Sequence, residues 1–192
     1  MCIRDRYTLD QIVRSGKVRY IGGSTMPAYK FAQMLMIADW KGYARPIAMQ
    51  NLYNLVAREE EREMNRLCNE QGVGLIPYSP LARGFLAGNR NKGGGGETER
   101  SKNDALVKAD TYRDSDWEVV DRLKKVAAGK NASPAQAALA WLLSKPYMGS
   151  PIIGATSLDQ LTSAAQATEF TVTPDEAKLL EEPYQFRVSP ES

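Results

Sequence analysis

The chain has 192 residues, of which 43% are hydrophobic and 25% are charged, and its net charge is +2. This is the composition of an ordinary globular protein with one or two domains. The lysines and arginines are scattered, so the sequence lacks the basic footprint of a nucleic-acid-binding protein, and no apolar run approaches the ~18 residues of a membrane span. Histidine is absent, which excludes Ser-His-Asp and Cys-His triads and the common histidine-containing zinc sites.

The first residues and the two cysteines indicate the compartment. Residues 1–6 lack the apolar core of a secretory signal. Cys2 and Cys68 set no disulfide framework, and Cys68 lies in an amphipathic run where a small buried hydrophobic residue is expected. The sequence therefore predicts a cytoplasmic protein with no metal site.

Strand-like and helix-like segments alternate along the rest of the chain. Strands are predicted over 18–21, 46–51, 73–77 and 150–155, and helices over 7–15, 27–41, 58–71, 115–129, from 133, over 157–168 and from 173. Each strand is followed by at least one helix, which is the pattern of parallel βα units. Four such units make half of an eight-stranded (β/α) barrel, whose full length is typically ~250 residues. Ser133 with Gln136, Ser157 with Gln160, and Thr173 with Glu176 are expected to cap helices.

The third strand ends at the most informative position of the chain. Residues 73–76 are mostly apolar, which favours a strand buried on both faces, and Pro77 and Pro80 end it. Tyr78 and Ser79 are thereby held at its carboxyl end, where parallel α/β folds bind ligands. Tyr78 is therefore a candidate binding residue, although taken alone it is equally well interpreted as an ordinary half-buried aromatic residue.

A long polar segment, 85–113, follows and contains four consecutive glycines, 93–96. The glycine run lacks the spaced Gly-Lys-Ser/Thr pattern of a phosphate loop. Loops of this length inside a domain are usually functional or disordered. We expect a flexible loop over one face of the domain, and a linker between two domains is the alternative.

The chain resembles the carboxyl-terminal half of bacterial aldo-keto reductases from about residue 8 to residue 188. The resemblance rests on seven segments in the family's order: GKVRYIGGST, IAMQNLYNLVAREEEREM, CNEQGVGLIPYSPLARGFLAG, ETERSKND, SPAQAALAWLLSK, PIIGATSLDQL and LEEPY. It implies the last four βα units of a TIM barrel, with parallel strands. It also implies that NADPH binds across the carboxyl ends of the strands and exchanges hydride with a carbonyl or alcohol substrate.

The resemblance gives residues at these strand ends a role in cofactor binding. Ser24, Thr25 and Gln50 would hydrogen-bond the nicotinamide carboxamide, with Thr25 standing where many members have Asn. Tyr78 would stack on the nicotinamide ring. The pyrophosphate would lie along the following loop, where Arg83 adds charge; its residues are Ser79, Pro80, Leu81, Ala82, Arg83 and Gly84.

The adenosine 2′-phosphate would meet the turn that begins the helix 157–168, because helix N-termini suit anions. The residues implied are Gly154, Ala155, Thr156, Ser157 and Gln160. Many family members place Lys or Arg in this turn, and a bidentate cation holds such a phosphate best. The implied cofactor is therefore NADP, with NAD as an alternative. Ser157 and Gln160 also have a purely structural interpretation as a capping box.

The family's catalytic Asp, Tyr, Lys and His lie on the first four barrel strands, which by this resemblance the chain lacks. No catalytic residue is assigned, because Tyr20, Tyr43, Tyr53 and Tyr112 have no matching Lys/Asp context. The family is an NAD(P)H-dependent oxidoreductase acting on aldehydes and ketones, and we expect this chain alone to be inactive. A non-catalytic nucleotide-binding or assembly module and a non-functional truncation product are the alternatives.

Residues 1–6 match nothing in the family, so we interpret them as a non-native or artefactual leader before a half barrel over 7–192. A half barrel leaves the strands 18–21 and 152–154 with unpaired edges. We expect marginal stability or self-association through these edges. The partners expected are a nicotinamide dinucleotide and, in a full-length parent, a small carbonyl substrate.

Overall fold

A computed structural model describes residues 3–93, 96 and 111–187. It confirms an α/β fold with parallel strands. Three strands form one sheet in the order β1-β2-β3, with every pair parallel. They are β1 (Ile21–Ser24), β2 (Pro46–Gln50) and β3 (Gly74–Leu75). The first strand thus begins where its predicted range ended, at Ile21.

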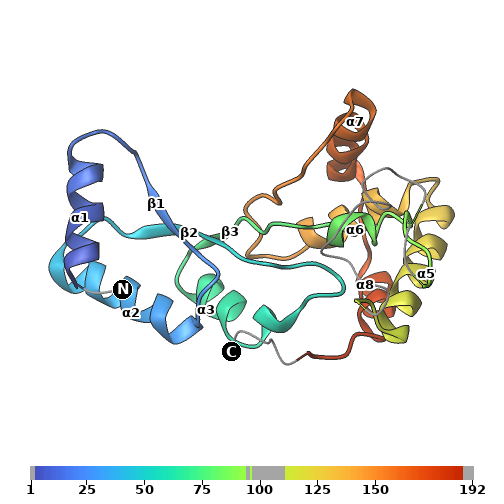
Figure 1. Ribbon diagram of the computed structural model, residues 1–192, viewed down its shortest axis with the longest axis horizontal. Coiled ribbons are helices and arrows are strands. Elements are labelled where there is room, and N and C mark those ends of the chain that lie inside the picture. The colour runs from blue at the N-terminus through green and yellow to red at the C-terminus, as the bar shows by residue number, and fades with distance from the viewer. Residues whose placement is uncertain (1–2, 94–95, 97–110, 188–192) are drawn as a thin grey trace.

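The helices of the first half pack beside this sheet (Figure 1). They are α1 (Ile3–Arg14), α2 (Ala28–Lys41), the short 3₁₀ turn η1 (Glu59–Glu61) and α3 (Met64–Glu70). Helix α2 places Phe31, Met34 and Leu35 on one face at the spacing of a helical stripe, and these side chains pack with Met49 and Leu75 of the sheet. Gly42 ends α2 with a left-handed φ of 65°.

The helix predicted over 58–71 is interrupted. Glu63, with a φ of −136°, separates η1 from α3. Glu59 and Glu63 stand four residues apart, a spacing at which like charges destabilise a helix. The acidic run therefore breaks the helix, and only its second half is α-helical.

The fourth strand predicted over 150–155 is wrong, since no strand forms there. This segment follows the open edge of β3, where a parallel bridge joins Met148 to Leu75 and the Ile152 N–H donates to the Pro77 carbonyl at 2.8 Å. Two prolines explain why the backbone of 150–155 does not form a regular set of hydrogen bonds with β3. Pro77 limits β3 to two residues, and Pro151 removes a donor from the segment beside it.

The second half of the chain forms a layer of helices at the opposite end of the molecule from α1 (Figure 1). Its elements are η2 (Ala82–Gly84), α5 (Asp114–Gly129), α6 (Pro134–Leu143), α7 (Leu158–Gln166), η3 (Ala167–Glu169) and α8 (Pro174–Glu181). The capping boxes predicted at Ser133 and Thr173 are both confirmed. Among the described residues, no helix is long and apolar enough to cross a membrane.

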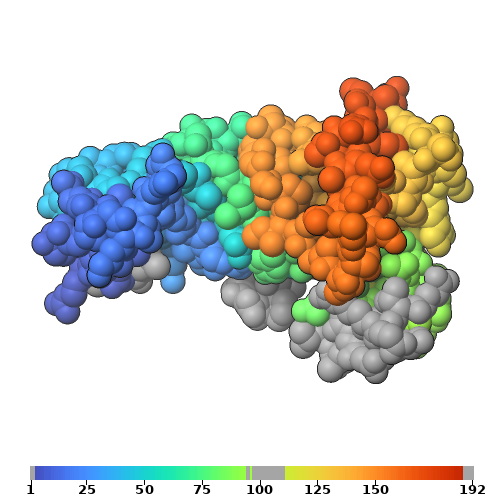
Figure 2. Space-filling view, turned by 90° about the horizontal axis from the view of Figure 1, so that it is seen from above, coloured from blue at the N-terminus to red at the C-terminus, as the bar shows by residue number. Residues whose placement is uncertain are grey.

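Two hydrophobic clusters divide the molecule into two lobes. The sheet lobe contains β1–β3 and α1–α3, and its cluster includes the fully buried Phe31 and Met49. The helical lobe contains α5–α8, and its cluster includes the fully buried Tyr53 and Trp141. The space-filling view shows the two lobes side by side in an elongated molecule (Figure 2).

The start of the predicted flexible loop belongs to the helical lobe. Phe85 and Leu86 are fully buried in its cluster, so a loose loop from residue 85 onward is wrong at this end. Residues 94, 95 and 97–110 of the predicted loop lie outside the described residues. Residues 3–6, predicted as part of a leader, continue helix α1, and Arg6 is buried.

Candidate functional site

Residues from three neighbouring chain segments meet at the carboxyl edge of the sheet. Ser24 stands directly opposite Gln50 in the β1–β2 register, and the Thr25 N–H donates to the Gln50 carbonyl at 3.0 Å. Beyond β3, the Tyr78 N–H donates to the Asn51 carbonyl at 3.0 Å. Ser24 and Thr25 are exposed, whereas Gln50 and Tyr78 are half-buried. The structure therefore brings together the four residues predicted around the nicotinamide.

Two glycines allow β1 to lie this close to its neighbours. A Cβ on Gly23 would come within 2.7 Å of Met49 Cε and 2.8 Å of the Phe31 ring. A Cβ on Gly22 would lie 2.8 Å from the Ala48 carbonyl oxygen. Any side chain at these positions would push β1 away from β2 and α2, and Ser24 would lose its position beside Gln50.

The loop after Tyr78 has an unusual backbone. Ser79, Ala82 and Arg83 have φ values of 53°, 46° and 56°, in the left-handed region that residues with a Cβ rarely adopt. Gly84 continues the series with a φ of 87°. Such conformations cost free energy and cluster at ligand-binding sites. The residues predicted to line a pyrophosphate thus share a strained conformation. Two of their N–H groups, those of Ala82 and Gly84, already donate to carbonyls within the loop.

Three side chains from outside the loop hold this backbone in place. Asn54 Nδ2 donates to the Ser79 carbonyl at 2.9 Å, Tyr112 Oη donates to the Ala82 carbonyl at 2.8 Å, and Arg90 Nη2 donates to the Arg83 carbonyl at 2.9 Å. The sequence did not predict this role for any of them. The one local signal was Asn54 itself, a polar residue within the apolar run 52–57 directly after β2.

The turn before α7 lies farther along the same edge. The Ile152 N–H, two residues before Gly154, bonds to the Pro77 carbonyl, and the turn 154–157 is exposed. Ser157 Oγ accepts from the Gln160 N–H at 3.3 Å, as predicted. Gln160 Oε1, however, accepts from the Thr156 N–H at 2.9 Å instead of the Ser157 N–H. The predicted capping box is therefore half formed, and this bond occupies the Thr156 N–H.

A partly buried hydrogen-bond network begins in the loop that follows β2. Tyr53 Oη donates to Glu61 Oε1 at 2.5 Å and lies 3.2 Å from Tyr147 Oη. Burial, together with the negative charge of Glu61, raises the pKa of Tyr53 far above its usual value. Burial likewise raises the pKa of Tyr147. Both phenols are therefore neutral near neutral pH.

The network extends through Arg58 to helix α8. Arg58 Nη2 lies 2.8 Å from Glu61 Oε2 and 3.1 Å from Glu181 Oε2. Glu181 Oε1 accepts from Lys145 at 2.6 Å and from the Trp141 indole at 2.7 Å. Burial opposes the charge on Glu181, but the bonds from Lys145 and Trp141 outweigh it and lower the pKa of this carboxyl. This network joins the loop after β2 to the helical lobe.

Cys68 and the acidic residues near α3 do not form a reactive or metal-binding group. Cys68 is fully buried, as predicted, and burial raises the pKa of its thiol to about 12. Burial also raises the pKa of Glu60. Within the described ranges, no three His, Cys, Asp or Glu side chains are grouped as metal ligands would be.

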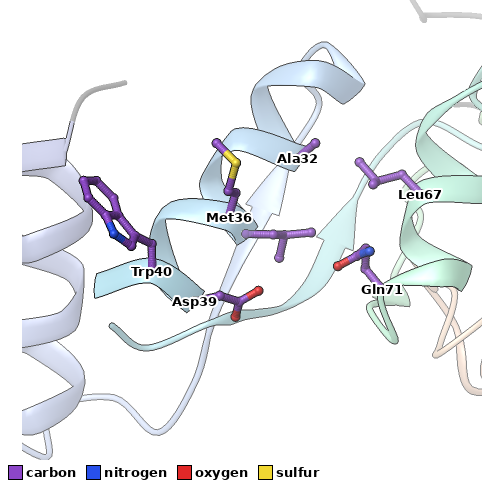
Figure 3. A pocket seen from close by; sticks show the side chains of 7 residues that line it. Ala32, Met36, Asp39, Trp40, Leu67 and Gln71 are labelled. Atoms are coloured by element: carbon purple, nitrogen blue, oxygen red, sulfur yellow. The ribbon is translucent and has the colours of Figure 1, made fainter. Parts of the chain in front are cut away.

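A hollow of about 650 Å³ lies between α2 and α3 (Figure 3). It is lined by Ala32, Leu35, Met36, Asp39, Trp40, Leu67 and Gln71. None of these residues lies at the carboxyl edge of the sheet. The hollow is therefore separate from the predicted binding residues.

Comparison with known proteins identifies the family. Residues 7–185 match the model of the aldo/keto reductase family. The chain is 43% identical over 180 residues to versiconal hemiacetal acetate reductase of Aspergillus parasiticus, covering 92% of this chain and 51% of that protein. It is 40% identical over 178 residues to an aldo-keto reductase of Fusarium vanettenii, covering 92% and 47%. It is 38% identical over 177 residues to an aldo-keto reductase of Metarhizium robertsii, covering 92% and 47%.

These relatives are fungal, so they give no support to a bacterial assignment. The chain spans about half the length of the curated relatives it matches. The match extends from α1 to beyond α8 and includes every strand of the sheet. The chain is therefore a member of the aldo/keto reductase family of oxidoreductases.

Proposed function

We propose that this chain is the carboxyl-terminal half of a (β/α)₈ barrel and that it holds a nicotinamide dinucleotide at the carboxyl edge of its strands. The parent enzyme would transfer hydride between NADPH and a carbonyl or alcohol in the cytoplasm. The observation that carries the proposal is the pairing of Ser24 with Gln50, with Tyr78 beyond the end of the next strand. Parallel α/β folds bind ligands at this edge.

The donors and acceptors at this edge fit a nicotinamide carboxamide. That group has one acceptor oxygen and an NH₂ donor, and both the Ser24 hydroxyl and the Gln50 amide can donate and accept. The half-buried Tyr78 ring would stack on the nicotinamide, which contributes roughly 0.5–1.5 kcal/mol beyond the area that it buries. When bound, the dinucleotide supplies the hydride, and these residues bind and orient its ring.

The loop 79–84 would lie along the pyrophosphate. Successive right- and left-handed residues form backbone concavities that bind anions. The loop has one such step, from Leu81 at φ −101° and ψ 16° to the left-handed Ala82. The N–H groups of Ala82 and Gly84 are already bonded within the loop. Arg83 adds a positive charge.

The adenosine end of the proposed site should discriminate only weakly between NADP and NAD. No lysine or arginine occurs in the sequence between residues 146 and 177. The N–H groups of Thr156 and Gln160 are already bonded within the cap. A 2′-phosphate at Gly154, Ala155, Thr156 and Ser157 would therefore meet no bidentate cation from this stretch. NADP remains the proposed cofactor, and we expect its affinity to exceed that of NAD by less than about tenfold, or 1.4 kcal/mol.

We further propose that the chain contains the cofactor-binding residues but lacks the catalytic Asp, Tyr, Lys and His. One observation supports this: the sequence contains no histidine. The same observation favours a non-catalytic dinucleotide-binding module as a second candidate function.

Titration of the purified chain with NADPH and NADH tests the cofactor site. We expect saturable quenching of tryptophan fluorescence, and a Kd for NADPH about tenfold higher in Tyr78→Ala, since the substitution removes both the stacking and the buried ring. Tyr20→Ala, at an exposed tyrosine before β1, is the matched control and should bind as the wild type does. An absence of binding by the wild type would refute the cofactor site.

Turnover separates the remaining candidates. We expect no oxidation of NADPH when the chain is mixed with a generic aldehyde, because the general acid is missing. Measurable aldehyde reduction would show that the chain contains its own general acid. It would refute the proposal that the chain lacks the catalytic residues.

We also propose that the open sheet associates with a second copy. Within the described residues β1 forms one end of the sheet and leaves that edge unpaired. Apolar side chains near the sheet are exposed as well: Tyr20 just before β1, Ile47 in β2 and Ile152 beyond β3 are 70%, 46% and 42% exposed. Unpaired sheet edges are templates for pairing with another chain. Sedimentation velocity should show a dimer fraction that grows with concentration. A monomer at every concentration, with a sharp cooperative melt, would refute this association.

A further inference from the structure

The loop 79–84 contains three non-glycine residues with positive φ within five positions. Each of their carbonyl groups accepts a hydrogen bond from a side chain outside the loop. The three pairs are Ser79 with Asn54, Ala82 with Tyr112, and Arg83 with Arg90. Residues in such sparsely populated conformations persist only where surrounding structure holds them. The side-chain bonds therefore fall on the three residues whose backbone needs support.

Asn54 is fixed on every side. It is 1% exposed, and its backbone N–H and carbonyl pair with the carbonyl and N–H of Ala57, both at 3.1 Å. Its Oδ1 accepts from the Val56 N–H at 3.0 Å, so the side-chain amide must turn its Nδ2 toward Ser79. Asn54 also follows Gln50 by four residues. The loop is thus tied to the strand that presents the nicotinamide contact.

Tyr112 is held equally firmly from the other side of the loop. Its ring stacks on Phe85, with centroids 3.7 Å apart and planes 8° from parallel. Phe85 is fully buried and also meets the Trp117 ring edge-on at 4.8 Å. Phe85 follows Gly84 directly, so the stacked pair anchors the end of the strained segment while the Tyr112 hydroxyl holds its middle.

We infer that Asn54 and Tyr112 are positioning residues for the dinucleotide: they hold the loop 79–84 in its left-handed conformation before the ligand arrives. This inference rests on the proposed function of the loop. A ligand that binds one loop conformation loses apparent affinity in proportion to the fraction of molecules in that conformation. Weakening either bond should therefore weaken dinucleotide binding through the conformation of the loop.

Two conservative variants test the inference in the full chain. Tyr112→Phe removes one hydroxyl and keeps the ring stacked on Phe85. Asn54→Asp keeps the size and the acceptor for the Val56 N–H, but sets a carboxylate oxygen against the Ser79 carbonyl. We expect the Kd for NADPH, measured by fluorescence titration, to rise about tenfold in each.

Tyr184→Phe is the matched control. It removes a tyrosine hydroxyl that accepts from the Arg58 N–H at 3.0 Å and donates to Glu59 at 2.5 Å, and it leaves the loop untouched. Its Kd for NADPH should stay within about twofold of the wild type. A tenfold rise in this variant as well would mean that affinity follows overall stability, which would overturn the positioning role.

A second substitution provides a readout that a merely structural role would not change. Glycine adopts positive φ without a Cβ penalty, so Ala82→Gly should hold the left-handed conformation without the Tyr112 hydroxyl. We expect the double variant Tyr112→Phe with Ala82→Gly to recover a Kd within about threefold of the wild type. Failure to recover would overturn the proposed mechanism.

Amide hydrogen exchange separates the inference from the proposed function. In the absence of ligand, the N–H groups of Gly84 and Leu86, both bonded to the Leu81 carbonyl, should exchange faster in Tyr112→Phe and Asn54→Asp than in the wild type. If the wild type binds no NADPH, the proposed cofactor site is wrong. Faster exchange in the two variants would then still show that Asn54 and Tyr112 hold the loop 79–84 in its conformation. If the wild type binds and both variants match it in Kd and exchange, the positioning role is wrong.

Discussion

The sheet lobe and the helical lobe are stabilised to different degrees. The buried cluster of the helical lobe is the larger, with Trp141, Leu123 and Leu180 fully enclosed. The sheet lobe has a smaller cluster and leaves Trp40 and Tyr20 70% exposed. The proposed nicotinamide contacts at Ser24 and Gln50 lie on the weaker lobe, whereas the loop 79–84 is anchored in the stronger one. The proposed cofactor site thus combines the loop 79–84, which is anchored in the larger cluster, with a sheet edge at Ser24 and Gln50 that is supported by the smaller one.

The largest expected effect on stability comes from a substitution in the core of the helical lobe. Trp141→Ala should lower the free energy of unfolding by about 3–5 kcal/mol, because it leaves a cavity at a fully buried position of the larger cluster and removes the bond to Glu181. Chemical denaturation measures the loss. Trp40→Ala removes an exposed indole of the sheet lobe and should change stability by less than about 0.5 kcal/mol. Equal losses would contradict the assignment of the main core to the helical lobe.

The charge on Glu181 should contribute the next largest effect. Its pKa is lowered in the folded chain, so its contribution is present above the unfolded value of about 4.3 and is lost as the pH falls through the folded value. Glu181→Gln should destabilise the chain at pH 7 by about 1.5–3 kcal/mol, since charge-assisted bonds to Lys145 and Arg58 are lost.

Denaturation at neutral and acidic pH checks the sign. The wild type should lose more stability on acidification than Glu181→Gln does, because the variant has no carboxylate to protonate. Glu70→Gln, at an exposed position ending α3, should follow the wild type at both pH values. Parallel pH profiles for the wild type and Glu181→Gln would show that the network contributes nothing.

A smaller effect is expected at the edge of the sheet lobe. Gly23→Ala should destabilise the chain by about 1–3 kcal/mol, since the new methyl group overlaps Met49 and Phe31. It should also weaken NADPH binding, because β1 must move and carry Ser24 away from Gln50. Gly129→Ala, where a Cβ meets nothing within 4 Å, is the control and should be neutral or slightly stabilising. Unchanged binding in Gly23→Ala would place the nicotinamide elsewhere.

Local signals in the sequence predicted some of the strand ends. Pro77 and Pro80 mark where the third strand stops, so Tyr78 could be placed at its carboxyl end without coordinates. Gly22 and Gly23 instead lie inside β1, which extends three residues beyond its predicted range, so the position of Ser24 came from the family resemblance. The fourth strand could not be judged in this way. Its ladder depends on β3 being long enough to pair, and Pro77 and Pro151 remove that partner from both sides.

The conformation of the loop 79–84 could not be predicted from the sequence, for a different reason. Ala82 and Arg83 carry a Cβ, and no local pattern predicts a left-handed backbone there. The groups that support it, Asn54 and Tyr112, lie about 25 residues before Ser79 and 30 residues after Ala82. Such pairings join segments that are distant in the sequence, so they become visible only when the helical lobe has folded.

Tyr147 and Met148 have a consequence for how the molecule unfolds. Both side chains pack against the sheet cluster and against the helical cluster, so loss of order on one side removes contacts from the other. While these two residues are in place, the halves should melt in a single transition. Shortening both to alanine would uncouple them, and the sheet half would then melt first, at a temperature of its own.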